Sequence, residues 1–160
     1  PFKDICEHIA NRNSANKSDV LMFFDYPADE DVMQNLMTTV APDAIHYMRY
    51  QNNKYNEEQI LKMFSGMIRY TCNALDGNFD LERASTALGV NNPVIEIMLE
   101  MFEDTGMIKI KERNEDAFKI EFLQSVELSK ALHTMKYAEF VELMNTINDY
   151  KNKFMTIDIV

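Results

Sequence analysis

The chain has 160 residues, two cysteines and a formal net charge of −10. This length buries roughly 68–70% of the unfolded surface, which is enough for one sound core or two small ones. The net acidity disfavours phosphate-driven binding of duplex DNA by the chain as a whole. No apolar run approaches the roughly 20 residues that cross a bilayer, and no cleavable signal pattern is present, so we expect no membrane partner. Cys6 and Cys72 lie far apart without metal-ligand spacing, which suits a reducing cytoplasm.

Residues 1–55 are predicted to form a partial parallel α/β unit. Residues 2–11 show helical spacing of apolar side chains, and residues 20–24 form a continuous apolar run typical of a strand buried on both faces. Asp29 is placed to cap a following helix, and residues 44–50 are expected to form a second strand. Strand, helix and strand in so few residues predict parallel pairing. Because two parallel strands make a poor sheet alone and the chain begins with Pro1, we expect it to be a piece of a longer protein.

Residues 56–122 are predicted to form a winged-helix unit. A helix over residues 56–75 begins with a capping box of Asn56 and Gln59. Asp80 is expected to cap a helix over residues 81–88, and Asn92 with Pro93 to open the next one. The apolar period then changes from 3.6 to 2 over residues 108–111 and 118–122, with a polar turn between them, which indicates a β-hairpin. Phe118 and Ile120 are expected to pack this hairpin onto the helix that starts at Pro93.

Residues 123–160 are predicted to form a C-terminal helical extension, with a short first helix and a second over about residues 137–150. Residues 154–160 alternate as a final strand would. The expected fold class is therefore α+β: a partial βαβ unit, then a helix-turn-helix with a hairpin, then C-terminal helices.

Catalytic signatures are not expected in this chain. His8, His46 and His133 lie in separate segments without a second ligand nearby, so we expect no metal and no cofactor. Asp25 follows an apolar run, as the acid of a nucleotide site does, but no glycine-rich loop with a lysine accompanies it. The favoured interpretation is that Asp25 binds local backbone N–H groups.

Two segments are candidates for contact with nucleic acid or a partner. The second helix of the predicted helix-turn-helix displays Glu96, Glu100, Glu103 and Asp104, which oppose phosphates and base readout. Positive charge gathers instead on the hairpin and on an aromatic stretch near residue 50, where single strands can stack. Edge protection of the hairpin and ordinary packing of the tyrosines are the favoured alternatives. The candidate contact residues are Arg49, Tyr50, Lys54, Tyr55, Lys109, Lys111 and Arg113, with Lys119 beside the last three.

Four stretches carry a resemblance to a known family. Residues 20–27 (VLMFFDYP), 45–50 (IHYMRY), 77–81 (GNFDL) and 98–108 (MLEMFEDTGMI) resemble the C-terminal accessory region of bacterial RecJ-type single-strand-specific DNA exonucleases. The likeness extends to about Tyr150 and consists of apolar patterns and turns. The Asp-His-His motif and metal-binding aspartates of that family's nuclease core are absent from this sequence.

The resemblance implies a parent enzyme that degrades single-stranded DNA from 5′ to 3′ in repair and recombination, with Mg or Mn in its core. The present chain is then its non-catalytic tail, which positions DNA or a partner protein for the core in the same polypeptide. The alternative is a free-standing winged-helix transcription regulator, for which a basic recognition helix is required and not found.

Overall fold

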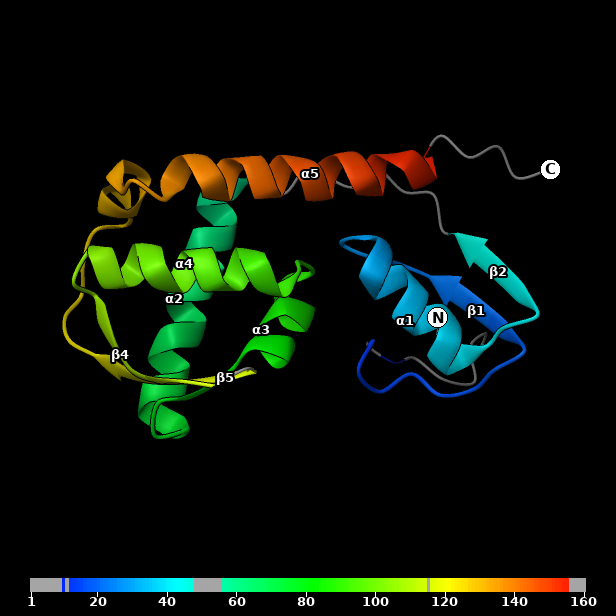
Figure 1. Ribbon diagram of the computed structural model, residues 1–160, viewed down its shortest axis with the longest axis horizontal. Helices are drawn as coiled ribbons and strands as arrows, with labels where there is room; N and C mark the ends of the chain where they lie inside the picture. Colours follow the sequence, from blue (N-terminus) through cyan, green and yellow to red (C-terminus); the bar gives the residue numbers. More distant parts are fainter. Residues whose placement is uncertain (1–9, 11, 48–55, 115, 156–160) are drawn as a thin grey trace, which may run out of the picture.

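The computed structural model describes residues 10, 12–47, 56–114 and 116–155. The fold is mixed α+β, with a two-stranded parallel sheet, a three-stranded antiparallel sheet and helices around them (Figure 1). The predicted helix over residues 2–11 lies outside the described residues, apart from residue 10, and so does the end of the predicted second strand. In chain order the elements are β1 (Val20–Phe23), α1 (Glu30–Val40), β2 (Ala44–Tyr47), α2 (Glu57–Ala74), β3 (Asn78–Asp80), α3 (Leu81–Leu88), α4 (Asn92–Asp104), β4 (Ile108–Arg113), β5 (Ala117–Phe122), the 3₁₀ helix η2 (Leu128–His133) and α5 (Tyr137–Met155).

The first unit is the predicted strand–helix–strand. β1 and β2 pair in parallel, with Val20 opposite Ala44 and Phe23 opposite Tyr47. α1 begins where expected, because an Asp29 carboxylate oxygen accepts a hydrogen bond from the Val32 amide at 2.9 Å. The prediction that β1 is buried on both faces is wrong: Val20 is 51% exposed, and only Phe23 of this strand is buried. The described part of this sheet has two strands.

The second unit contains a strand that the sequence did not indicate. β3 pairs antiparallel with β5, with Phe79 opposite Phe118, and the sheet order is β3-β5-β4. β3 has only three residues and follows the tight turn at Gly77, so it lacks the alternation that reveals a longer strand. Its existence depends on pairing with residues about 40 positions later.

The two helices after β3 have the predicted caps, with one shift. Asp80 accepts a hydrogen bond from the Arg83 amide at 2.8 Å, and α3 ends at Gly89, whose φ of 64° is left-handed. α4 is capped by Asn91 and not by Asn92, so Pro93 is its second helical residue. Pro93 has no amide hydrogen, which costs nothing in the first turn of a helix.

The hairpin of β4 and β5 has the expected alternation. Ile108, Phe118 and Ile120 are buried, whereas Lys109 and Lys111 point to solvent. The expected packing partner is wrong in part, because β5 lies mainly against α2 while β4 lies against α4. The pairing of β5 between β3 and β4 makes it the central strand and places it over α2.

The core lies where α2, α4 and α5 meet. Phe64, Phe102 and Phe140 are fully buried there, and the rings of Phe64 and Phe102 meet edge to face with centroids 5.2 Å apart. Each helix buries one face and leaves charged side chains on the other. None of the described helices is long and apolar enough to cross a membrane.

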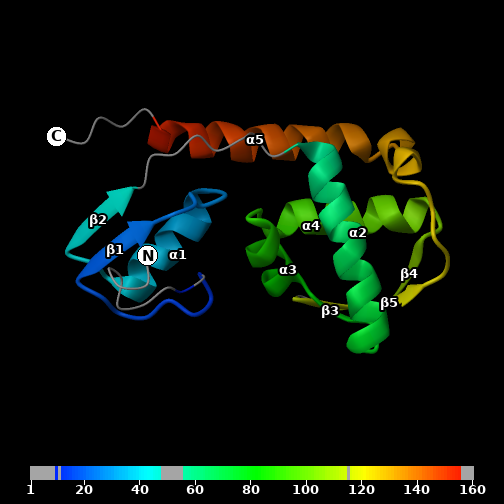
Figure 2. The same cartoon turned by 180° about the vertical axis from the view of Figure 1, so that it is seen from behind.

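α5 joins the two units. In Figures 1 and 2 it runs above α4 at its start and beside the parallel sheet at its end. It continues past the predicted end at Tyr150, and Phe154 lies in the helix and not in a strand. The reason is tertiary: the Phe154 ring stacks on Tyr26 and Tyr47, with centroids 5.4 and 5.3 Å apart. Residues 156–160 of the predicted strand are outside the described residues.

Candidate nucleic-acid interface

α4, the helix that a groove-reading protein would present to DNA, is largely covered. α5 lies along it on one side, and α3 packs on it as well. Beyond its first turn, the positions that are not buried are Glu96, Glu100, Glu103 and Asp104. All four are acidic, so the outward stripe of α4 repels phosphates. The buried positions are Val94, Ile95, Ile97, Met98, Leu99, Met101 and Phe102.

Two carboxylates of this stripe hold neighbouring elements. Glu100 lies 3.4 Å from the Arg113 guanidinium at the end of β4 and 3.0 Å from the Lys136 ammonium just before α5. Partial burial tends to raise the pKa of Glu100, but the hydrogen bond and charge of Lys136, with those of Arg113, outweigh it and leave the pKa below its ordinary value. Glu103 accepts a hydrogen bond from the Ile110 amide at 2.8 Å.

The positive charges of the hairpin are mostly neutralised within the chain. Lys111 lies 2.6 Å from Glu121, whose pKa this hydrogen bond lowers. Arg113 lies between α4 carboxylates and over the ring of Phe118, 5.6 Å from its centroid. Lys119 pairs with Asp76 at 2.9 Å. Of the hairpin cations, only Lys109 forms no ion pair with a described residue.

The second candidate segment is described only at its start. Arg49, Tyr50, Lys54 and Tyr55 lie outside the described residues. Tyr47, which precedes them, stacks on Phe23 with ring centroids 5.5 Å apart. Its phenol has a raised pKa, mainly because of burial and secondly because of nearby Tyr26. Tyr47 therefore packs against Phe23, in agreement with the interpretation that the tyrosines of this stretch are packing residues.

Asp25 has the local role that the sequence favoured, together with a distant partner. The Tyr26 amide donates to its carboxylate at 2.9 Å, and the Lys151 ammonium of α5 lies 3.4 Å away. The carboxyl end of β1, where α/β proteins bind ligands, thus faces the end of α5. Burial lowers the pKa of Lys151, and Asp25 partly offsets this effect.

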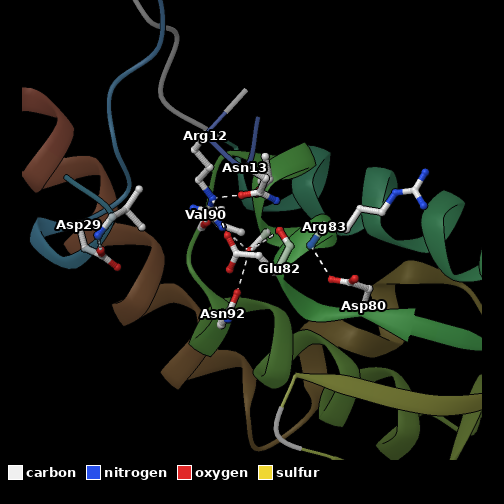
Figure 3. Close-up of polar contacts among 11 residues, drawn as sticks. Arg12, Asn13, Asp29, Asp80, Glu82, Arg83, Val90 and Asn92 are labelled. Atoms are coloured by element: carbon white, nitrogen blue, oxygen red, sulfur yellow. Dashed lines mark hydrogen bonds and ion pairs between the residues drawn. The ribbon is translucent and has the colours of Figure 1, made fainter. Parts of the chain in front are cut away.

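A polar network centred on Arg12 ties the start of the described chain to the α3–α4 turn (Figure 3). The Arg12 guanidinium donates to the hydroxyls of Thr86 at 2.7 Å and Ser85 at 2.5 Å, and to the carbonyl of Val90 at 3.3 Å. The Glu82 carboxylate forms an ion pair with the Arg12 guanidinium, with Oε1 and Nε 3.1 Å apart. Sequence reasoning missed this network, because Arg12 is at least 70 residues from these partners.

A groove between α2 and α3 was also missed. It has a volume of about 380 Å³ and is open to solvent. Tyr70 is 57% exposed beside it, and the exposed Arg83 lines its other side. The available signal was the position of Tyr70 on the exposed side of the amphipathic helix α2, a side on which Met63 is also exposed. The remaining lining residues include Met67, Thr71, Leu75, Asn78, Phe79, Asp80, Ala84 and Ala87.

The described residues contain no cluster of three or more His, Cys, Asp or Glu side chains placed to hold a metal ion. His133 contacts the Ser129 carbonyl at 2.7 Å through Nδ1, and His8 lies outside the described part. Comparison of the chain with protein-family models, curated proteins and solved structures finds no significant match.

Proposed function

We propose that this chain is the non-catalytic C-terminal accessory domain of a RecJ-type single-strand-specific 5′ to 3′ DNA exonuclease that acts in DNA repair and recombination. The nuclease core of the same polypeptide holds Mg or Mn and performs the hydrolysis in the cytoplasm. The present chain positions single-stranded DNA or a DNA-repair protein for that core. The resemblance of residues 20–27, 45–50, 77–81 and 98–108 to that family's accessory region is the basis for the family assignment.

Residues 56–122 in this proposal have a winged-helix arrangement. Its support is the order α2, β3, α3, α4, followed by the β4–β5 hairpin, with a tight α3–α4 turn at Gly89. Fold alone does not fix function, so the use of this arrangement has to be argued from its surface.

The observation that carries the accessory role is the covering of α4. A recognition helix enters the major groove with exposed polar and basic side chains. Here α5 lies along α4, and the stripe that remains outside is acidic at Glu96, Glu100, Glu103 and Asp104. This arrangement suits a scaffold and disfavours the alternative of a free-standing transcription regulator.

The exposed side chains of the parallel sheet support the proposal that it contacts another part of the parent protein. Val20 is 51% exposed and Ile45 is 38% exposed, although both belong to strands of an α/β unit. Parallel sheets are normally covered on both faces. Val20 is paired with Ala44 and Ile45 with Leu21, so the two exposed side chains lie on opposite faces of the sheet, and a nuclease core that wraps around this end of the sheet would bury both.

A chimera tests the proposal. The nuclease core of a RecJ-type exonuclease is prepared without its own C-terminal region, alone and fused to this chain. We expect the fusion to degrade labelled single strands from the 5′ end further per binding event than the core alone. The isolated chain with Mg²⁺ or Mn²⁺ is expected to release no nucleotides. A matched control fusion carries Val20→Lys and Ile45→Lys, which place charge at the proposed contact without touching the core of the domain.

Equal degradation by the core with and without the chain would contradict the accessory role. Nanomolar, sequence-specific binding of duplex DNA by the isolated chain would instead support the regulator.

A further inference from the structure

Three of the six described cations that form no ion pair lie on α2 and α3, and the other three are Lys17, Lys109 and Lys130. Lys62, Arg69 and Arg83 are exposed and form no ion pair with any residue in the described ranges. Lys62 and Arg69 are seven residues apart, so they share one outer face of α2.

An exposed aromatic ring lines the α2–α3 groove together with Arg83. Tyr70 follows Arg69 on α2, and it forms one side of the α2–α3 groove while Arg83 lines the opposite side. The groove volume of about 380 Å³ is within the range of roughly 300–1,000 Å³ found for small-ligand sites. Its one acidic lining residue, Asp80, already accepts the hydrogen bond of the Arg83 amide at 2.8 Å.

We infer that this face binds single-stranded DNA, with one base stacked on Tyr70 in the groove and adjacent phosphates held by Arg83 and Arg69. Proteins that bind single strands without sequence preference combine exposed aromatic rings with cations along the backbone path. The hairpin offers fewer free cations, because Lys111, Arg113 and Lys119 are already paired with carboxylates. This inference rests on the proposed function, in which the chain positions a single strand, and it assigns that contact to α2 and α3.

The absence of tryptophan from the sequence provides a direct reporter. Tyr70→Trp keeps an aromatic ring at the groove and makes it the single indole in the chain. An oligothymidylate added to this variant is expected to quench the indole emission, because a stacked base lies against the ring. The affinity is expected to be roughly 10⁻⁴–10⁻⁶ M, as for non-specific binding, and to fall as salt is added.

Two charge variants locate the phosphate contacts. Arg83→Glu and Lys109→Glu change the net charge equally, and both residues are exposed without an ion pair in the described part of the chain. We expect Arg83→Glu to weaken binding and to flatten the logarithmic salt dependence by roughly 0.7 per lost phosphate contact. Lys109→Glu is expected to leave that slope nearly unchanged.

Tyr70→Ala tests stacking in the unlabelled chain by fluorescence anisotropy of the oligonucleotide. Stacking of roughly 1–3 kcal/mol per base predicts a loss of about five- to 150-fold. Thermal unfolding checks that each variant remains folded, as expected for exposed side chains.

Four results would overturn the inference. The first is that the oligonucleotide does not bind, and the second is that it binds without quenching the indole. The third is equal affinity for duplex and single strand. The fourth is a larger loss of affinity in Lys109→Glu than in Arg83→Glu. If the chain binds no DNA but still extends degradation in the chimera, this inference fails while the proposed function stands. If it binds DNA as described but leaves the chimera unaffected, the accessory role fails instead.

Discussion

The ammonium group of Lys151 lies 3.4 Å from both carboxylate oxygens of Asp25, a residue 126 positions earlier in the chain. It also donates a hydrogen bond to the carbonyl of Gly89 at 3.0 Å, so one side chain of α5 contacts both the end of β1 and the α3–α4 turn. The two partners differ in burial, since the Lys151 side chain is 7% exposed and that of Asp25 is 43% exposed.

This difference predicts unequal costs for the two halves of the pair. Asp25→Asn leaves a buried ammonium without the Asp25 charge, and we expect it to cost about 1–3 kcal/mol of unfolding free energy. Lys151→Met replaces the buried cation with an apolar chain of similar length and leaves a carboxylate that water reaches. Its expected cost is smaller, within about 1 kcal/mol. Urea unfolding measures both, and a larger loss for Lys151→Met would contradict the explanation.

Tyr150 provides a pH-dependent test of the same junction. Its hydroxyl donates to a Glu30 carboxylate oxygen at 2.9 Å, and burial, followed by that hydrogen bond and the charge of Glu30, raises its pKa. The unfolded chain loses this proton near pH 10, whereas the folded chain keeps it. The stabilisation from Tyr150 is therefore fully present below pH 10 and is lost as pH rises above it.

The variant Tyr150→Phe removes both the hydrogen bond to Glu30 and the hydroxyl group that titrates. We expect it to be less stable than the unmodified chain by about 0.5–1.5 kcal/mol at pH 7. The difference should narrow above about pH 10, because only the unmodified chain loses this stabilisation. Urea unfolding at pH 7 and over the alkaline range checks this, and a constant difference at all pH values would show that the hydroxyl does not carry the effect.

Local signals in the sequence were sufficient for most of the helix starts. Asp29, Asn56 and Asp80 cap the helices that they were expected to cap, because a cap bonds to amides two or three residues away. The change of period from 3.6 to 2 after Gly106 likewise predicted the hairpin. These features depend on neighbours in the chain and not on distant packing.

Features set by distant contacts were not predictable in the same way. β3 exists through pairing with β5, and α5 extends to Met155 because Phe154 meets Tyr26 and Tyr47. The candidate site shows the same limit. The sequence displayed the hairpin cations, but the ion pair of Arg113 with Glu100 joins separate elements and appears only in three dimensions.

The hairpin predicts a contrast between its two faces. Phe118 is 6% exposed and belongs to the core, so Phe118→Ala should cost about 3–5 kcal/mol, as other large-to-small core changes do. Lys109 is exposed without an ion pair to a described residue, and Lys109→Ala should change stability by less than about 0.5 kcal/mol. Lys119 is unsuitable as the control, because it pairs with Asp76. Thermal or urea unfolding measures the stability of both variants. Similar losses of stability would show that Phe118 does not lie on the buried face and Lys109 on the exposed face of the hairpin.

Three glycines of the chain differ in backbone conformation and in the space around them. Gly77 and Gly106 have nearly equal φ values of 72° and 73°, in the left-handed region. A Cβ at Gly77 would lie well inside contact distance of the Ile120 carbonyl oxygen, whereas at Gly106 the nearest atom is the Gln124 side-chain nitrogen at 3.5 Å. Gly66 is inside α2, and a Cβ there would meet no atom within 4 Å.

These differences predict a ranked series of alanine variants. Gly66→Ala should stabilise the chain by about 0.5–1 kcal/mol, because alanine is the better helix residue. Gly106→Ala should cost about 1–2 kcal/mol for the left-handed conformation alone. Gly77→Ala should cost more than Gly106→Ala, because its Cβ would also clash with the Ile120 carbonyl oxygen of β5. Moving β5 away to relieve the clash would weaken the hydrogen bond from the Ile120 amide to the Gly77 carbonyl, which is 2.9 Å long. Urea unfolding of the three variants gives the order, and equal losses at Gly77 and Gly106 would mean that β5 does not lie against the turn as described.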